Sequence, residues 1–189
     1  AQANLGMMYE NGDGVQQDYK KAIKWYQLSA KQGVNTARNN LGVMYLTGEG
    51  ILQDYKKALF WFRLAAKSGH SRSQNALGTV YEIGEFILSD YKQAAKWYQL
   101  AAAQGDAMGQ NNLGAMYYKG IGVRKNLKKA FKLFQLAAEQ NYLPAQNYLG
   151  IMYSDGEGIL KSSEKAIEWY RRAGKKGYHN AQYNLGLRY

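Results

Sequence analysis

The sequence contains no cysteine, which excludes disulfide bonds, a thiol nucleophile and thiolate metal ligands. Its single proline, Pro144, leaves most of the chain free to form long helices. Its two histidines, His70 and His179, do not have the i, i+4 spacing of a helical metal site. No apolar run reaches the ~18 residues that span a bilayer, and no signal segment is visible. The lack of cysteine does not identify a compartment, so the localisation stays open.

A short pattern repeats along the whole chain at a fixed spacing. A Leu-Gly pair recurs every 36 residues, at Leu5-Gly6, Leu41-Gly42, Leu77-Gly78, Leu113-Gly114, Leu149-Gly150 and Leu185-Gly186. A fixed period of this size indicates a repeat architecture. We therefore expect one repeat domain over residues 1–189, with repeats at 1–36, 37–72, 73–108, 109–144, 145–180 and a partial repeat at 181–189. Because the chain begins and ends within a repeat, we expect it to be a piece of a longer protein.

Each repeat begins with a predicted helix. In the second repeat, Ala37, Leu41, Gly42 and Tyr45 have the i, i+4, i+5, i+8 spacing of one helical face. A glycine inside a helix costs about 1 kcal/mol relative to alanine. Its recurrence in every repeat predicts that a second helix crosses at this point, too close for a Cβ atom.

A glycine loop is expected after this helix. Gly48 and its equivalents stand where a left-handed C-cap residue is needed. A second glycine follows two residues later except in the third repeat, which has Phe86, so we expect the third loop to differ from the others. The next column contains residues that favour helix N-caps: Asp18, Asp54, Asp90, Asn126 and Ser162.

A longer second helix should follow each cap. We expect it to direct a Trp-Tyr pair inward, as at Trp25 and Tyr26, with Leu133 replacing the tryptophan in the fourth repeat. It should end at a glycine such as Gly33, or at Asn141 in the fourth repeat, because asparagine also tolerates the left-handed conformation. The sequence thus predicts an all-α, right-handed α/α solenoid of five 36-residue helix-loop-helix repeats plus the first helix of a sixth.

The complete pattern, A-x-x-x-L-G-x-x-Y-x-x-G-x-G-V/I-x-x-D-x-x-K-A-x-x-W-Y-x-x-A-A-x-x-G, resembles the Sel-one-like repeat, a relative of the tetratricopeptide repeat. The resemblance covers the whole chain; its departures are Phe86, Leu133 and Asn141. It implies a non-enzymatic scaffold for protein–protein interactions. In bacteria such proteins include adaptors, signalling components and host-directed virulence factors.

Two columns of asparagine on the first helices are the candidate binding site. Their neighbours Leu41 and Tyr45 face the partner helix, so these amides should point elsewhere, and in tetratricopeptide-like solenoids that side lines the concave groove. An amide can both donate to and accept from a peptide backbone. We expect a protein or peptide segment to bind there through Asn39, Asn40, Asn75, Thr79, Asn111, Asn112, Tyr118 and Asn147. The alternative is that some of these amides bond to the neighbouring helix, since buried polar groups must be satisfied.

The net charge of +11 raises a second function, binding to nucleic acid, an acidic partner or an anionic membrane. Most lysines lie on the second helices opposite the Trp and Ala positions, which is typical of a solvated convex face. Nucleic acid is therefore the weaker alternative. End-to-end self-association through the terminal repeats also stays open.

An enzyme is not expected. The glycine loops recur too regularly to be phosphate sites, and their acidic residues are one repeat apart, too far for paired carboxylate chemistry. We predict no catalytic residue, no metal and no cofactor.

Overall fold

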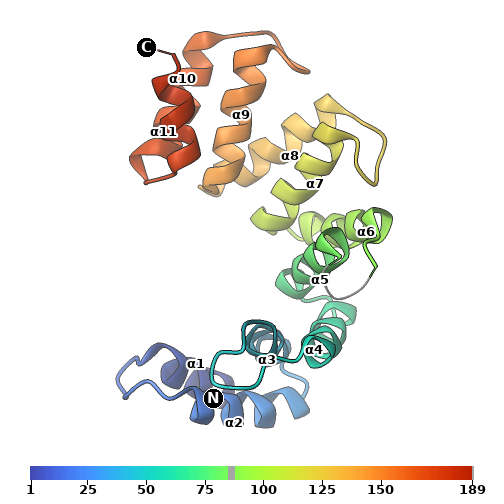
Figure 1. Cartoon of the computed structure of the whole chain (residues 1–189), viewed down its shortest axis with the longest axis vertical. Coiled ribbons are helices and arrows are strands. Elements are labelled where there is room, and N and C mark those ends of the chain that lie inside the picture. The colour runs from blue at the N-terminus through green and yellow to red at the C-terminus, as the bar shows by residue number, and fades with distance from the viewer. Residues whose placement is uncertain (85–87, 189) are drawn as a thin grey trace. The chain divides into compact units, whose positions relative to one another are not determined.

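The computed structural model describes residues 1–84 and 88–188 of the chain, which form eleven α-helices without any strand (Figure 1). The helices are α1 Gln2–Asn11, α2 Tyr19–Lys31, α3 Asn35–Thr47, α4 Tyr55–Lys67, α5 Ser71–Ile83, α6 Tyr91–Ala103, α7 Ala107–Lys119, α8 Leu127–Glu139, α9 Leu143–Asp155, α10 Ser163–Lys175 and α11 His179–Gly186. The predicted all-α solenoid of about five helix-loop-helix repeats and a partial sixth is confirmed.

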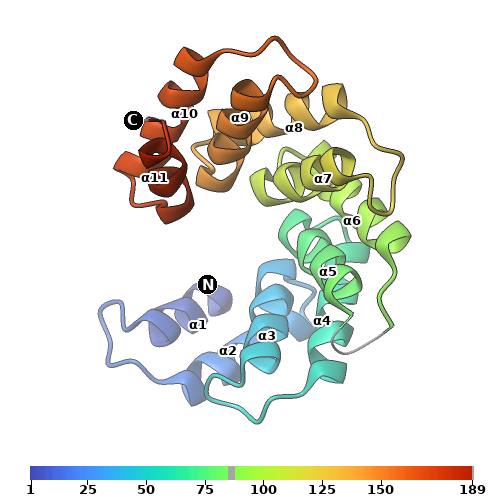
Figure 2. The same ribbon diagram turned by 45° about the horizontal axis from the view of Figure 1, so that its top comes forward.

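The chain divides into two compact units, residues 1–89 and 90–189. Within the first unit each helix from α1 to α5 packs on the next, and within the second unit each helix from α6 to α11 does so. Figure 2 shows α7, α9 and α11 along one side of the second unit and α8 and α10 along the other; α1, α3 and α5 form the matching row of the first unit. We call the side formed by these odd-numbered helices the first-helix face of each unit.

The first helices of the repeats begin slightly earlier than the predicted repeat boundaries. Helices α3, α5, α7 and α9 start at Asn35, Ser71, Ala107 and Leu143, two residues before the expected starts at 37, 73, 109 and 145. The residue before each start has extended backbone geometry, so the helix begins two residues before the first position of the pattern.

The glycine of the Leu-Gly pair is the point of closest approach between the two helices of a repeat. A Cβ atom on Gly42 would lie 2.5 Å from the Phe62 ring, and one on Gly150 would lie 2.4 Å from the Tyr170 ring. The predicted close crossing is confirmed, and an aromatic ring of the second helix occupies the space.

That ring belongs to the residue after the tryptophan. Tyr26 and Phe62 are 0% and 1% exposed, whereas Trp25 and Trp61 are only half-buried. Trp61 packs against the core formed by α2 and α3, which lies between the preceding repeat and its own. The prediction that both residues of the pair fill the core is therefore correct only for the second one. The tryptophan covers the seam between successive repeats.

The capping columns are confirmed. In each repeat the side chain of the cap residue accepts a hydrogen bond, 2.9–3.3 Å long, from the backbone N–H three residues later. Left-handed glycines follow the first helices and most of the second helices, and Asn141 (φ 63°) takes this region after the second helix of the fourth repeat. Phe86 lies outside the described residues, so the expected difference of the third loop stays a prediction.

Candidate functional site

The asparagine column expected to bind a partner is largely buried. Asn75, Asn111 and Asn147 are 8%, 6% and 7% exposed, and Asn39 is half-buried. The Oδ1 atom of Asn39 accepts a hydrogen bond from Ser73 Oγ at 2.8 Å, which ties α3 to α5. These side chains therefore contact the neighbouring first helix, as the alternative reading of the column allowed.

A similar hydrogen bond joins two first helices in the second unit, but Asn111 lacks it. Asn147 Oδ1 accepts from Asn184 Nδ2 at 2.9 Å across α9 and α11. The Oδ1 atom of Asn111 is buried and has no hydrogen-bond partner. The reason is in the sequence: Ala145 stands where Ser73 would donate, and Tyr148 stands where Asn184 would donate. Asn111 Nδ2 donates instead to Asn112 Oδ1 at 3.2 Å.

The second asparagine column is more open. Asn40 and Asn112 are half-buried on the first-helix faces of their units. Asn40 hydrogen-bonds to the Tyr26 hydroxyl, which also donates to the Glu10 carboxylate. Burial, then the bond to Glu10, raises the pKa of Tyr26 above its ordinary value. Asn40 therefore supports the buried Tyr26 ring, and both asparagines keep some exposed surface.

Tyr118 belongs to an aromatic cluster between α7, α8 and α9. Its ring lies 5.9 Å from the Tyr148 ring and 6.5 Å from the Phe134 ring, between ring centroids. Tyr148 stacks on Phe134 at a centroid distance of 4.4 Å with the planes 5° from parallel. Burial, then a hydrogen bond to Glu157, raises the pKa of Tyr118.

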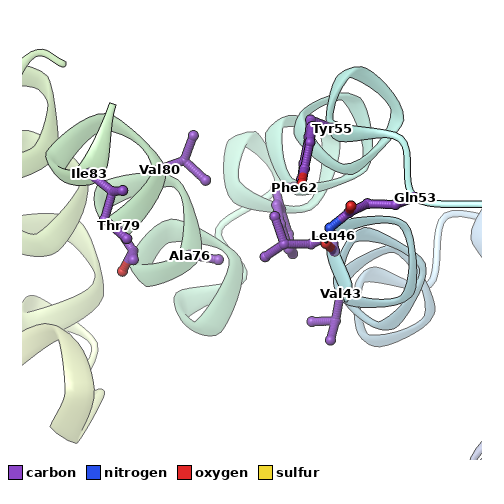
Figure 3. A pocket seen from close by; sticks show the side chains of 9 residues that line it. All are labelled: Val43, Leu46, Gln53, Tyr55, Phe62, Ala76, Thr79, Val80 and Ile83. Atoms are coloured by element: carbon purple, nitrogen blue, oxygen red, sulfur yellow. Dashed lines mark hydrogen bonds between the residues drawn. The ribbon is translucent and has the colours of Figure 1, made fainter. Parts of the chain in front are cut away.

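The corresponding place in the first unit is an open pocket, about 360 Å³ in volume, between α3 and α5 (Figure 3). We call it the α3–α5 pocket. Its lining residues are Val43, Leu46, Gln53, Tyr55, Phe62, Ala76, Thr79, Val80 and Ile83. Figure 3 shows the α5 side chains on one side, those of α3 on the other, and Phe62 between them. Thr79 is the only predicted site residue in this lining.

Two small side chains create this pocket. Ala76 stands in a column that has asparagine or tyrosine in the other repeats, and Val80 in one that has methionine in the other four complete repeats. In the second unit, Tyr148 and Met152 occupy these two positions. Ala76 interrupts the second asparagine column, but the pocket was not predicted because a link between Ala76 and Val80 is not part of the repeat pattern. Two side chains that are smaller than their equivalents and lie one helical turn apart are the sequence signal that would have predicted the pocket.

A further column was missed by the sequence analysis. The side chain one residue before the Asn39 column donates to a carbonyl near the C-terminus of the preceding long helix, at 2.9–3.5 Å in every case. The five donor residues are Arg38, Gln74, Gln110, Gln146 and Gln182. Each of these carbonyls also accepts the backbone N–H of the residue three positions later, so the side chain adds a second hydrogen bond to it. The column holds successive repeats together and is not a site.

The loop of the fourth repeat has an unusual charge. The other described loops contain an acidic residue, Asp13, Glu49 or Glu157, at the position of Ile121. The N-cap Asn126 is also neutral, whereas the caps Asp18 and Asp54 form ion pairs with the lysine three residues later. Arg124, Lys125 and Lys129 line a pocket of about 520 Å³ there, and Lys129 Nζ lies 5.2 Å from the centre of the Tyr117 ring. Lys128, next to them, is exposed.

Within residues 1–84 and 88–188, no three His, Asp or Glu side chains gather in a way that suits a metal ion. None of the helices in this part of the chain combines the length and apolar character needed to cross a membrane.

The Sel1 repeat sequence model matches residues 1–34, 36–70, 71–106, 107–142, 143–178 and 179–189. The fold is similar to a Sel1 repeat protein from Oxalobacter formigenes (36% identity, TM-score 0.92, covering 98% of this chain and 76% of the other). It is also similar to a protective antigen of uropathogenic Escherichia coli with an SLR fold (38% identity, TM-score 0.84, 97% of this chain but 39% of the antigen). An immunity protein from Pseudomonas aeruginosa shares the fold at 20% identity (TM-score 0.64, 95% and 68%). No curated protein matches the chain.

Proposed function

The chain belongs to the Sel1 repeat family, and we propose that it is a non-enzymatic module that binds a protein segment on its first-helix face. Sel1 repeat proteins are generally scaffolds for protein interactions. The relatives at 36% and 38% identity are bacterial, and one of them is a protective antigen of a pathogen. This supports a role in a bacterial protein that meets a host, as an adaptor or virulence factor.

The observation that carries the proposal is the α3–α5 pocket on the first-helix face. Val43 and Ile83 at its edge are 36% and 63% exposed, and Phe62 forms its base. Exposed apolar groups beside a concave site are typical of places where a partner is bound.

The predicted site residues divide into two groups under this proposal. Asn39, Asn40, Thr79, Asn112 and Tyr118 keep some exposed surface and are proposed to contact the partner. The buried residues Asn75, Asn111 and Asn147 are proposed to act indirectly, by setting the spacing of the first helices.

A capture experiment with matched variants tests the proposal. The tagged protein is incubated with bacterial and host cell lysates at about 0.05 and 0.5 M salt, concentrations that separate screened from unscreened charge interactions. Val43→Glu places a charge on the first-helix face, while Leu52→Glu makes a comparable change at a loop leucine that is 88% exposed. A partner that survives high salt, is lost with Val43→Glu and is kept with Leu52→Glu supports the proposal. A partner that both variants retain contradicts it.

The fourth-repeat loop supports a second candidate function, binding of an acidic partner through Arg124, Lys125, Lys128 and Lys129. Ile121 and Asn126 stand where the first two repeats have acidic residues. This local difference favours the fourth-repeat loop over a uniformly basic convex surface as the binding site. Binding should then weaken steeply with salt. Replacing Arg124, Lys125 and Lys128 by Gln should abolish it, whereas the same change at Lys20, Lys24 and Lys31 of the first repeat should not. Equal effects of the two triple variants would point to net charge alone.

A further inference from the structure

We propose that the α3–α5 pocket receives an aromatic side chain, phenylalanine or tyrosine, from the bound partner segment. This inference rests on the proposed function and names what the first-helix face recognises. Its basis is a comparison of two places in the same chain, 72 residues apart, that share one backbone arrangement.

The second unit contains its own occupant of the equivalent place. Phe134 is the counterpart of Phe62, and Tyr148 is the counterpart of Ala76. Tyr148 covers Phe134 with nearly parallel planes at a centroid distance of 4.4 Å. The repeat therefore accommodates a ring beside the buried phenylalanine. In the first unit Ala76 supplies no ring, and the pocket lies next to Phe62, which stays 1% exposed.

The size and chemistry of the pocket fit such a ring. Its volume of about 360 Å³ exceeds the roughly 150 Å³ of an apolar cavity that binds benzene. Val43, Leu46, Val80 and Ile83 supply apolar walls. A planar aromatic ring, like that of Tyr148 in the second unit, gains from the burial of its surface against these walls, whereas Phe62 is only 1% exposed and offers little face for stacking.

The polar groups of the pocket argue against a charged occupant. Gln53 Nε2 donates to the Leu46 carbonyl at 2.7 Å, and Thr79 Oγ1 donates to the Asn75 carbonyl at 3.2 Å. No Asp, Glu, Lys or Arg belongs to the lining. A charged side chain would lose its hydration there without gaining an ionic partner.

The test is an NMR titration of the full chain with N-acetyl-phenylalaninamide, beside its cyclohexylalanine analogue and N-acetyl-aspartamide. We expect saturable shift changes at Val43, Thr79 and Val80 with the aromatic probe and weaker binding of the other two. Ala76→Tyr, which copies Tyr148, should fill the pocket and weaken the probe at least about tenfold. Asn4→Tyr adds a tyrosine at an exposed position of the same column, two repeats earlier, and should leave the affinity within about twofold.

Several results would overturn the inference. These are no saturable binding, unchanged binding by a folded Ala76→Tyr variant, or equal affinity for the cyclohexyl analogue. Val80→Met, which restores the methionine of the other repeats, serves as the filling variant if Ala76→Tyr does not fold. Equal binding of the aspartamide would also contradict it.

The capture experiment separates this inference from the proposed function. If Ala76→Tyr retains a partner that Val43→Glu loses, the first-helix face binds the partner without using the pocket, and only the inference fails. If the probe binds but no first-helix-face variant affects any captured partner, the proposed function fails and the pocket remains a site for aromatic groups.

Discussion

Tyr148 stacks face to face on Phe134, whereas Ala76 leaves the equivalent Phe62 beside an open pocket. Removing the ring with Tyr148→Ala should therefore open a similar pocket in the second unit. We expect a loss of about 2–3 kcal/mol in the free energy of unfolding, from lost stacking and burial. Urea denaturation followed by circular dichroism measures it. Tyr183→Ala, at a tyrosine that is 69% exposed, should change stability by less than about 0.5 kcal/mol.

Gly42→Ala tests the close crossing of the two helices in a repeat. The added Cβ would lie 2.5 Å from the Phe62 ring, and overpacking of this kind costs about 1–3 kcal/mol. Because alanine favours a helix over glycine by about 1 kcal/mol, we expect a net loss of about 1–2 kcal/mol. Gly186 stands in the same column with no atom within 4 Å of a built Cβ, so Gly186→Ala should cause no loss. Equal destabilisation by both variants would contradict the steric explanation.

Ala145→Ser should supply the missing donor to Asn111 Oδ1. Ser73 makes this bond to Asn39 at 2.8 Å in the first unit. We expect a gain of about 0.5–1 kcal/mol in the free energy of unfolding, because an orphaned buried acceptor becomes satisfied. The matched control is Ala37→Ser. Ala3 stands where an asparagine would accept from this serine, so the new hydroxyl lacks that partner. We expect Ala37→Ser to lower the free energy of unfolding by about 1 kcal/mol. The prediction fails if both serines have the same effect.

The N-cap carboxylates should make stability depend on acid. The hydrogen bond from the Lys57 N–H holds the pKa of Asp54 below its ordinary value of 3.8, and the Lys21 N–H does the same for Asp18. A lowered folded-state pKa stabilises the protein above the unfolded-state pKa, and this contribution is lost as the pH falls through the folded-state pKa.

Replacement of both carboxylates by asparagine keeps a side-chain cap, as Asn126 shows in the fourth repeat. The Asp18→Asn/Asp54→Asn variant should therefore lose less stability than wild type between about pH 7 and pH 2.5. The urea midpoint at each pH measures this difference. Parallel decreases in the two proteins would mean that other groups determine the acid response.

The candidate site was only partly predictable from the sequence. The asparagine column was found because it repeats, but periodicity does not state which neighbour a side chain meets. Asn39 and Asn147 turned out to bond to adjacent first helices, and Asn111 is buried without a partner for its carbonyl oxygen. The pocket was not predicted because it arises where Ala76 and Val80 depart from the repeat.

The sequence by itself determined the elements of this protein: a 36-residue period, the glycine that admits a ring, the N-cap residues and the left-handed glycines with Asn141 as their substitute. These features depend on local backbone geometry and on contacts between neighbouring helices, and both recur from repeat to repeat. Only the tertiary structure decided that Tyr26 rather than Trp25 fills the core and that Ala76 exposes a pocket. Both outcomes depend on which side chains from different helices compete for one volume, and a linear pattern does not record that competition.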